Sequence, residues 1–321
     1  MTKSLKVVAT SVAAALMIGP AIIAAQAQTK PVPIELRVVS APITNYTPLI
    51  VARDKGYFAA ENLAVTWTAV PGSGGVAVEA VYGGSAQIGG SSILEPMVAR
   101  GNGLDVMFFT AGAKIRSATP DNSALLVRTS DAIKEPKDLI GKSISAGLVN
   151  SVNHIHMMEW FERNKVDGKT VTYLELPFPQ MPDALFQNRI DAVWAVEPFL
   201  TIMLKTGNAR IFAQPYLENI PGMDITAYIA KEAWLKANPE LAMSFKRAID
   251  KATMDLVNGT KEERDGWVAK FTGVKAELVA DMTLPNFTTE FNMVSLKANL
   301  DLAVKHKVVK TFDVNTMMWK K

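Results

Sequence analysis

Small, neutral hydrogen-bonding residues recur directly after short apolar segments of this sequence. Asn45 and Tyr46 follow the first such segment, Ser73 follows the second, and Ser91 and Ser92 follow the third. Each group can lead into a helix whose first backbone amides lack intrahelical partners. Taken singly, these residues are typical of plain helix caps. Their recurrence predicts binding of a polar ligand group or an anion at several helix starts.

The middle of the chain carries a second group of the same kind. Asn150, Ser151 and Asn153 precede or begin the amphipathic segment 154–164, whose spacing predicts a helix. His154, at the start of that helix, could donate a hydrogen bond to a ligand. We therefore count all four side chains as candidate ligand contacts.

Aromatic rings flank these polar segments. Tyr46, Trp194 and Phe199 lie close to them in the sequence and could form flat walls around an apolar part of a ligand. Packing in an ordinary core would explain the same residues.

Catalytic, metal and cofactor patterns are weak or missing. His154 and His156 are two residues apart and would point in different directions on a helix, and His306 is predicted to be solvated. Residues 72–77 fit G-x-G-x-x-A, but the acidic residue expected about 20 positions later in a dinucleotide site is missing. The sequence contains no cysteine and no G-x-S-x-G motif. We predict no catalytic residue, no metal site and no cofactor.

Composition describes a folded globular protein. Of 321 residues, 49% are hydrophobic and 20% are charged, with a formal net charge of +3. A disordered chain would have fewer apolar residues and a larger net charge. Lysine and arginine form no block, so a concentrated basic face for nucleic acid is not expected.

The N-terminus reads as a secretory signal peptide, residues 1–27. Lys3 and Lys6 precede an apolar run, and Ala25-Gln26-Ala27 fits the A-x-A cleavage pattern. Cleavage would remove both lysines and lower the formal charge from +3 to +1. Because no cysteine follows to carry a lipid, we expect a free protein in a Gram-negative periplasm.

Beyond the signal peptide, short apolar segments alternate with amphipathic ones, which predicts βαβ units and a mainly parallel sheet. Strands are predicted at residues 34–39, 63–70, 86–89, 105–111, 123–128, 143–147, 171–176, 190–196 and 225–230. Helices are predicted at residues 48–54, 76–82, 93–100, 154–164, 181–188 and 240–257. Ligands of open α/β sheets bind outside the carboxyl ends of the strands, where the polar residues above lie.

Several motifs resemble one protein family. Residues 48–58, PLIVARDKGYF, followed by Leu63, resemble the signature P-L-x-x-A-x-x-x-G-Y-F-x-x-x-G-L. Residues 138–142, DLIGK, and 190–198, IDAVWAVEP, resemble two further motifs of the same family. These are motifs of periplasmic substrate-binding proteins of the nitrate, sulfonate and taurine type, which are similar to thiamine-pyrimidine binding proteins. Asn62 replaces the usual glycine before Leu63.

The resemblance implies an α/β fold of periplasmic binding protein type II, with two lobes and a ligand cleft between them. Residues 28–118 and 224–321 would form lobe 1, and residues 119–223 would form lobe 2. The strands at 123–128 and 225–230 would join the lobes. Hinge closure around the ligand, as in a Venus flytrap, would follow.

Carried onto this chain, the resemblance adds Trp194, Glu197 and Asp224 to the candidate contacts. The full set is Asn45, Tyr46, Ser73, Ser91, Ser92, Asn150, Ser151, Asn153, His154, Trp194, Glu197 and Asp224. Neutral donors and backbone amides suit sulfonate, carboxylate or nitrate. Glu197 and Asp224 would instead favour a ligand with hydrogen-bond donors, so the identity of the ligand stays open.

The predicted function is capture of a small anionic or aromatic, heterocyclic solute and delivery to an ABC importer. The partners would be the solute, a membrane permease and its ATPase, and the protein would act as a monomer without enzymatic activity. Three alternatives remain open. The ligand could be a thiamine-pyrimidine-like heterocycle, the protein could be a secreted synthase or lyase with His154 as base, or its closed form could be recognised by a sensor.

Overall fold

The structure is a computed structural model that describes residues 1–2, 32–71 and 74–321. Residues Pro33–Lys321 form one compact unit, to which the following description applies. The predicted signal peptide lies outside the described residues except for Met1 and Thr2, and Ser73 lies outside them too.

The first of two sheets is built from both ends of the unit. Its strands are β1 (Ile34–Ser40), β2 (Leu63–Ala69), β3 (Ile88–Ser92), β4 (Val106–Lys114), β10 (Asp224–Lys231) and β11 (Asn286–Phe287). They lie in the order β11-β4-β10-β3-β1-β2. β1 runs parallel to β2 and β3, whereas β10 runs antiparallel to β3 and β4. An interior strand of this sheet, β10 between β3 and β4, therefore comes from the later part of the chain.

The second sheet comes from the middle of the chain. Its strands are β5 (Ser123–Arg128), β6 (Ser143–Ser145), β7 (Thr172–Tyr173), β8 (Ala192–Val196) and β9 (Ala209–Ala213). They lie in the order β7-β6-β8-β5-β9, with β5 antiparallel to both of its neighbours. β8 is buried along its whole length, as expected for a central strand covered on both faces.

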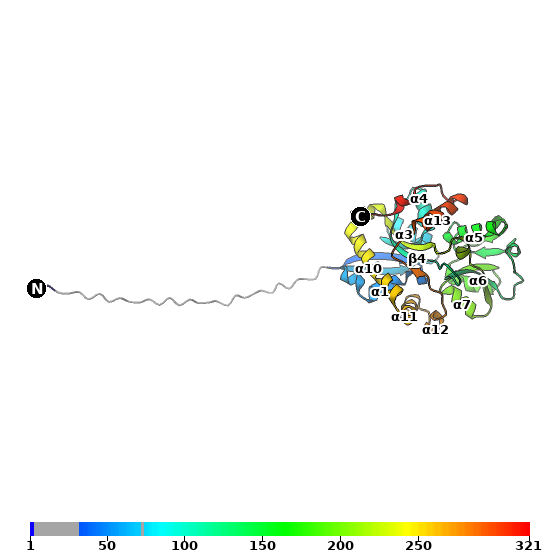
Figure 1. The fold of residues 1–321 in the computed structure, drawn as a ribbon, viewed down its shortest axis with the longest axis horizontal. Helices are drawn as coiled ribbons and strands as arrows, with labels where there is room; N and C mark the ends of the chain where they lie inside the picture. The colour runs from blue at the N-terminus through cyan, green and yellow to red at the C-terminus, as the bar shows by residue number, and fades with distance from the viewer. Residues whose placement is uncertain (3–31, 72–73) are drawn as a thin grey trace. The chain divides into compact units, whose positions relative to one another are not determined.

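Helices cover both sheets, and each sheet with its helices is called a lobe below (Figure 1). The first lobe contains η1 (Thr44–Tyr46), α1 (Pro48–Asp54), α2 (Tyr57–Ala60), α3 (Gly74–Gly83), α4 (Leu94–Gly101), α9 (Glu232–Ala237), α10 (Pro239–Asn258), α11 (Lys261–Thr272), α12 (Ala276–Val279), α13 (Met293–Lys305) and η5 (Val314–Met317). The second lobe contains η2 (Pro136–Leu139), α5 (Val152–Arg163), η3 (Gly168–Thr170), η4 (Phe178–Gln180), α6 (Met181–Phe186), α7 (Phe199–Lys205) and α8 (Pro215–Asn219). Among the described residues, no helix combines the length and the apolar character that a membrane span requires.

The core of the first lobe forms where α10 packs on the sheet. Ala242, Phe245 and Ile249 recur at helical spacing and are buried. The ring of Phe245 lies 5.5 Å from those of Phe58 and Tyr228. This aromatic cluster joins α10 to α2 and to β10.

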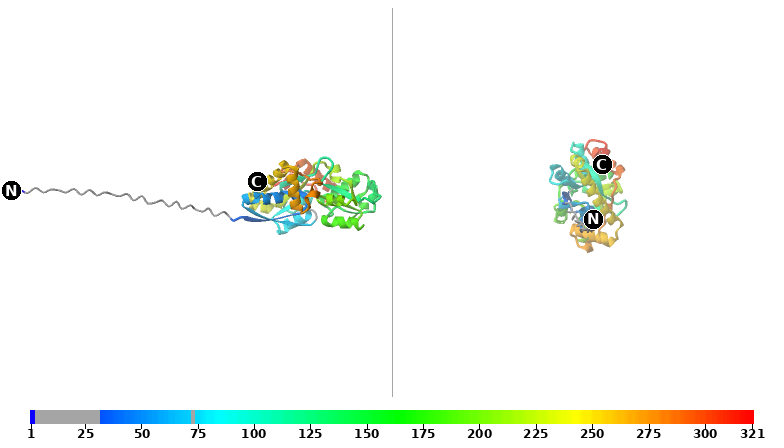
Figure 2. Two further views of the ribbon diagram at one scale, coloured as in Figure 1. Left: turned by 90° about the horizontal axis from the view of Figure 1, so that it is seen from below. Right: turned by 90° about the vertical axis from the view of Figure 1, so that its left-hand side faces the viewer.

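The chain passes between the sheets twice, once between β4 and β5 and once between β9 and β10. Each strand that was predicted to join the lobes is the first strand after such a passage, and it pairs within one sheet only. In Figure 2 the green second lobe lies at one end of the compact unit, and blue, yellow and orange segments of the first lobe lie at the other. The lobe boundaries given above remain a prediction.

Candidate functional site

A cavity of about 50 Å³ lies between the lobes. The first lobe lines it with Ala41, Ile43, Asn45, Tyr46, Gly74, Gly90, Ser92, Ile225 and Thr226. The second lobe lines it with Asn122, Ser123, Asn153, Phe178, Val196 and Tyr216. The described lining residues include no lysine, arginine, histidine, aspartate or glutamate. We call this cavity the interlobe pocket.

Tyr46 forms the first-lobe wall because β3 has no side chain at Gly90. A Cβ atom at Gly90 would lie 2.6 Å from the Tyr46 ring and 2.8 Å from the Ser40 Cβ. The Tyr46 ring also packs edge-on against Tyr228, with the ring centroids 5.9 Å apart. Burial, followed by the nearby Tyr228 and Glu95, raises the pKa of Tyr46 well above its usual value. Its hydroxyl therefore stays protonated at neutral pH.

The start of α5 forms the opposite wall. Ser151 caps this helix, since its hydroxyl accepts from the backbone amide of His154 at 3.3 Å. The cap places Asn153 in the first turn, where its carbonyl oxygen accepts a hydrogen bond from the Tyr216 hydroxyl. Trp194 lies fully buried behind Tyr216, with ring centroids 4.5 Å apart. Ser151 and Trp194 thus hold lining residues in place.

Backbone and side-chain hydrogen bonds cross the pocket between the lobes. The Asn122 side chain donates to the side-chain oxygen of Asn45 at 3.4 Å. The backbone amide of Thr44 donates to the carbonyl oxygen of Glu197 at 3.3 Å. These contacts belong to a closed arrangement and would break if the lobes separated.

Glu197 is a contact between the lobes and is not among the lining residues. Its carboxylate accepts from the hydroxyl and the amide of Thr201, at 2.8 and 3.1 Å, and from the amide of Thr283 at 3.2 Å. Burial raises the pKa of Glu197 to about 7, and these three hydrogen bonds act in the opposite direction. The Glu197 carboxylate therefore accepts its hydrogen bonds from the protein's own groups and not from a ligand in the pocket.

Asp224 also lies outside the interlobe pocket. Its carboxylate accepts from the Ser295 hydroxyl at 2.6 Å and from the Asn292 amide at 2.9 Å. Asn292 in turn caps α13. Burial raises the pKa of Asp224 above its usual value, against these hydrogen bonds. Asp224 therefore fastens α13 to β10.

The other predicted contacts have different surroundings. Ser91 is buried and donates to the carbonyl oxygen of Gly74 at 3.0 Å. Asn150 is exposed and donates its backbone amide to Nδ1 of His154 at 3.1 Å. The His154 ring packs against Tyr173, and burial lowers its pKa to about 4. Because His154 does not line the pocket, this geometry gives no support to its role as a general base.

Four of the predicted contacts line the pocket together, whereas other lining residues were not predicted from the sequence. Asn45, Tyr46, Ser92 and Asn153 come from both lobes. The missed polar residues are Asn122, Ser123, Thr226 and Tyr216. Asn122 precedes the strand predicted at 123–128 and Ser123 begins it, which was a usable signal, whereas no local pattern marks Tyr216.

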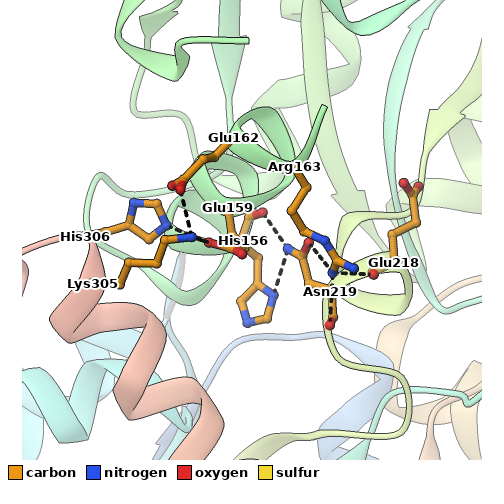
Figure 3. A network of polar contacts seen from close by, with 8 residues as sticks. All are labelled: His156, Glu159, Glu162, Arg163, Glu218, Asn219, Lys305 and His306. Carbon is orange, nitrogen blue, oxygen red and sulfur yellow. Dashed lines mark hydrogen bonds and ion pairs between the residues drawn. The ribbon is translucent and has the colours of Figure 1, made fainter. Parts of the chain in front are cut away.

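A second contact between the lobes joins α5 to α13 and the residue after it (Figure 3). Nε2 of the buried His156 lies 2.8 Å from the side-chain oxygen of Asn299. Glu159 accepts from Lys305 at 2.6 Å and from Nε2 of His306 at 3.2 Å. His306, predicted from sequence to be solvated, is instead about nine-tenths buried, because the end of α13 folds onto α5.

The same cluster has the composition of a metal site. One ligand atom each from Glu159, Glu162 and His306 lies within 4.8 Å of the others. However, the Lys305 ammonium group bridges the two glutamates, at 2.6 and 3.0 Å. The chain supplies its own cation at this position.

Known proteins share this fold. The alkanesulfonate-binding protein SsuA from Xanthomonas axonopodis pv. citri, bound to MOPS, is 18% identical, with 90% of this chain and 99% of that chain covered and a TM-score of 0.75. The periplasmic nitrate-binding protein NrtA from Synechocystis PCC 6803 is 13% identical, with 89% and 86% covered and a TM-score of 0.74. The periplasmic aliphatic sulphonate binding protein SsuA from Escherichia coli is 18% identical, with 90% and 92% covered and a TM-score of 0.70.

These structures have the periplasmic binding protein fold, which confirms the predicted fold class for this chain. No curated protein matches the sequence. A family model described as NMT1/THI5 like matches residues 43–262, more than half of the chain. The chain therefore belongs to the NMT1/THI5-like family.

Proposed function

We propose that this protein is a periplasmic solute-binding protein that captures a small solute between its lobes and delivers it to an ABC importer. The observation that carries the proposal is the interlobe pocket, whose walls come from both lobes and consist of neutral polar and apolar side chains. Such a mixture, apolar surface with a few placed polar groups, is typical of small-molecule sites.

Closure provides the mechanism. A solute in the pocket would contact Asn45, Tyr46 and Ser92 on one lobe and Asn153, Ser123 and Tyr216 on the other. Because these contacts exist together only when the lobes are closed, the solute favours the closed state by its differential affinity for that state. A membrane permease with its ATPase would then recognise the closed form.

The relatives support transport as the setting. Two are named as periplasmic binding proteins for nitrate or aliphatic sulphonate. Another, from Staphylococcus aureus, is named as the ligand-binding component of an ABC-type import system. We propose the same role in import for this chain, which would act as a secreted monomer that binds its solute without converting it.

Titration calorimetry tests the proposal with a panel of small sulfonates, nitrate, carboxylates, amides and nitrogen heterocycles. We expect saturable binding of at least one class, and we expect Asn153→Ala to weaken it at least tenfold. Asn258→Ala removes the same side chain from an exposed position at the end of α10 and should leave the affinity unchanged. A protein that binds no small solute, or that binds equally well after Asn153→Ala, would not fit the proposal.

A further inference from the structure

Three of the five hydroxyl groups among the described residues of the interlobe pocket use their hydrogens within the protein. Ser92 donates to the Glu95 carboxylate, and Ser123 donates to the Asp121 carboxylate at 3.2 Å. Tyr216 donates to the side-chain oxygen of Asn153. A hydroxyl carries one hydrogen and two lone pairs. Each of these groups therefore has only acceptor capacity left for a ligand.

Two carboxylates lie next to the pocket serines. Glu95 and Asp121 each hold one of the pocket serines. After burial, which is the largest cause, the negative charges of Glu95 and Asp121 raise the pKa of Tyr216 further. Arg116 donates its backbone amide to Asp121, and its positive charge acts to lower the pKa of that carboxyl against the larger effect of burial, but Arg116 lines a different cavity. The described residues that line the pocket itself include no cation.

The start of α4 is unsuited to a ligand anion because of Glu95. A helix N-terminus attracts negative charge, and here the chain's own Glu95 occupies the first turn of α4, next to the pocket residue Ser92. A ligand anion at this helix start would meet a carboxylate rather than free amides.

Unpaired donors remain on the pocket wall, and one of them is the buried hydroxyl of Thr226, which has no hydrogen-bond partner among the described residues. The side-chain nitrogen of Asn153, a residue only 4% exposed, has no hydrogen-bond partner among the described residues. An unsatisfied buried donor is costly. A ligand with an acceptor atom would satisfy it.

The inference about the ligand rests on the function proposed above. The directions of the hydrogen bonds and the charges around the pocket then define the class of ligand. We propose that the interlobe pocket binds a small solute that carries N–H donors, at least one acceptor and no net negative charge, and that it discriminates against anions of the same shape.

Isosteric probes test this directly. Guanidinium, urea and nitrate are planar and similar in shape but are positive, neutral and negative, as are benzamidinium, benzamide and benzoate. Each is titrated calorimetrically into the purified protein, and any solute carried through purification is identified by mass spectrometry. We expect a positive or neutral member to bind at least tenfold more tightly than its anionic counterpart, and any carried solute to bear N–H groups without net negative charge.

Two results would overturn this proposal in different ways. Binding of the anions as tightly as their counterparts, or an anionic carried solute, refutes the ligand class and leaves solute capture intact. If no probe binds and no solute is carried or bound from the wider panel, solute capture fails as well.

A pair of variants tests the contribution of the Glu95 charge. Glu95→Gln should reduce the preference for N–H probes over anions at least tenfold. Glu79→Gln makes the same charge change at an exposed position of α3 and should not alter the preference. Melting curves of both variants establish that they are folded. An unchanged preference in a folded Glu95→Gln variant contradicts the proposal.

Discussion

At the scale of single residues, Gly90 shapes the pocket through the side chain that it lacks. The space beside it is filled by Tyr46 and Ser40, at 2.6 and 2.8 Å from the position of a Cβ atom. The glycine thus allows an aromatic ring to lie directly on β3. A larger residue would have to displace this ring, and with it a wall of the pocket.

We expect Gly90→Ala to lower the free energy of unfolding by about 1–3 kcal/mol, because overpacking forces side chains and backbone to shift. Solute affinity should fall as well, since Tyr46 is displaced. Gly266→Ala is the matched control. Gly266 lies inside α11 with open space around its Cβ position, and the substitution should stabilise the protein by roughly 0.5–1 kcal/mol.

Urea denaturation measures both variants. The interpretation of Gly90 is wrong if the two alanine substitutions change stability in the same direction.

The candidate residues differ in how far the sequence could predict them. Ser92 and Asn153 lie near predicted strand and helix ends, and such positions do line the pocket. Glu197 and Asp224 also lie at strand ends, but besides the nearby Thr201 their carboxylates accept hydrogen bonds from Thr283 and Ser295, which come much later in the chain. Local spacing contains no information about these distant partners.

At the scale of elements, β3 illustrates the same limit. Residues 91–92 were predicted to follow a strand at 86–89, yet β3 extends to Ser92. Its last residues pair with β10, so that Ser92 lies opposite Thr226. The apolar pattern predicts that a strand exists, whereas its end depends on a partner strand more than 130 positions away. β9 was missed because its burial pattern lacks a clear period.

The contact between α5 and α13 should make stability depend on pH through His156. This ring is fully buried, and burial lowers its pKa from 6.5 to about 4, while the Asn299 hydrogen bond and Glu159 act to raise it and His306 acts to lower it. Below pH 6.5 the unfolded chain binds a proton that the folded protein does not accept. The contribution of His156 to stability is therefore present above pH 6.5 and is lost as the pH falls towards 4.

The expected loss across this window is on the order of 3 kcal/mol, the equivalent of the shift in pKa. Denaturation of the wild type and of His156→Gln at a series of pH values isolates this effect. The difference in stability between the two proteins should shrink as the pH falls from 6.5 to 4. A difference that stays constant over this range contradicts a neutral, buried His156.

At the scale of the whole molecule, the two lobes are interleaved in the chain, because β10 returns to the first sheet after the second is complete. The resemblance of several motifs to one family predicted this interleaved architecture. The class of ligand was beyond the reach of the sequence. It depends on which atoms receive the hydroxyl hydrogens of Ser92, Ser123 and Tyr216.

Ligand removal should destabilise the whole unit. A solute that binds only the closed, folded protein adds about 2.7 kcal/mol of stability at a concentration 100 times its dissociation constant. Protein stripped of solute by unfolding, dialysis and refolding should therefore melt at a lower temperature, and added solute should restore the original value. Equal melting temperatures before and after stripping would indicate that nothing was bound or that binding does not favour the folded state.

The central claim is that one small solute occupies the pocket between the lobes, and native mass spectrometry of the purified protein tests it most directly. We predict a one-to-one complex with a small solute, retained by Asn258→Ala and lost from Asn153→Ala. The contradicting result is a mass equal to that of the chain alone, for the wild type, even after incubation with the full panel of small solutes.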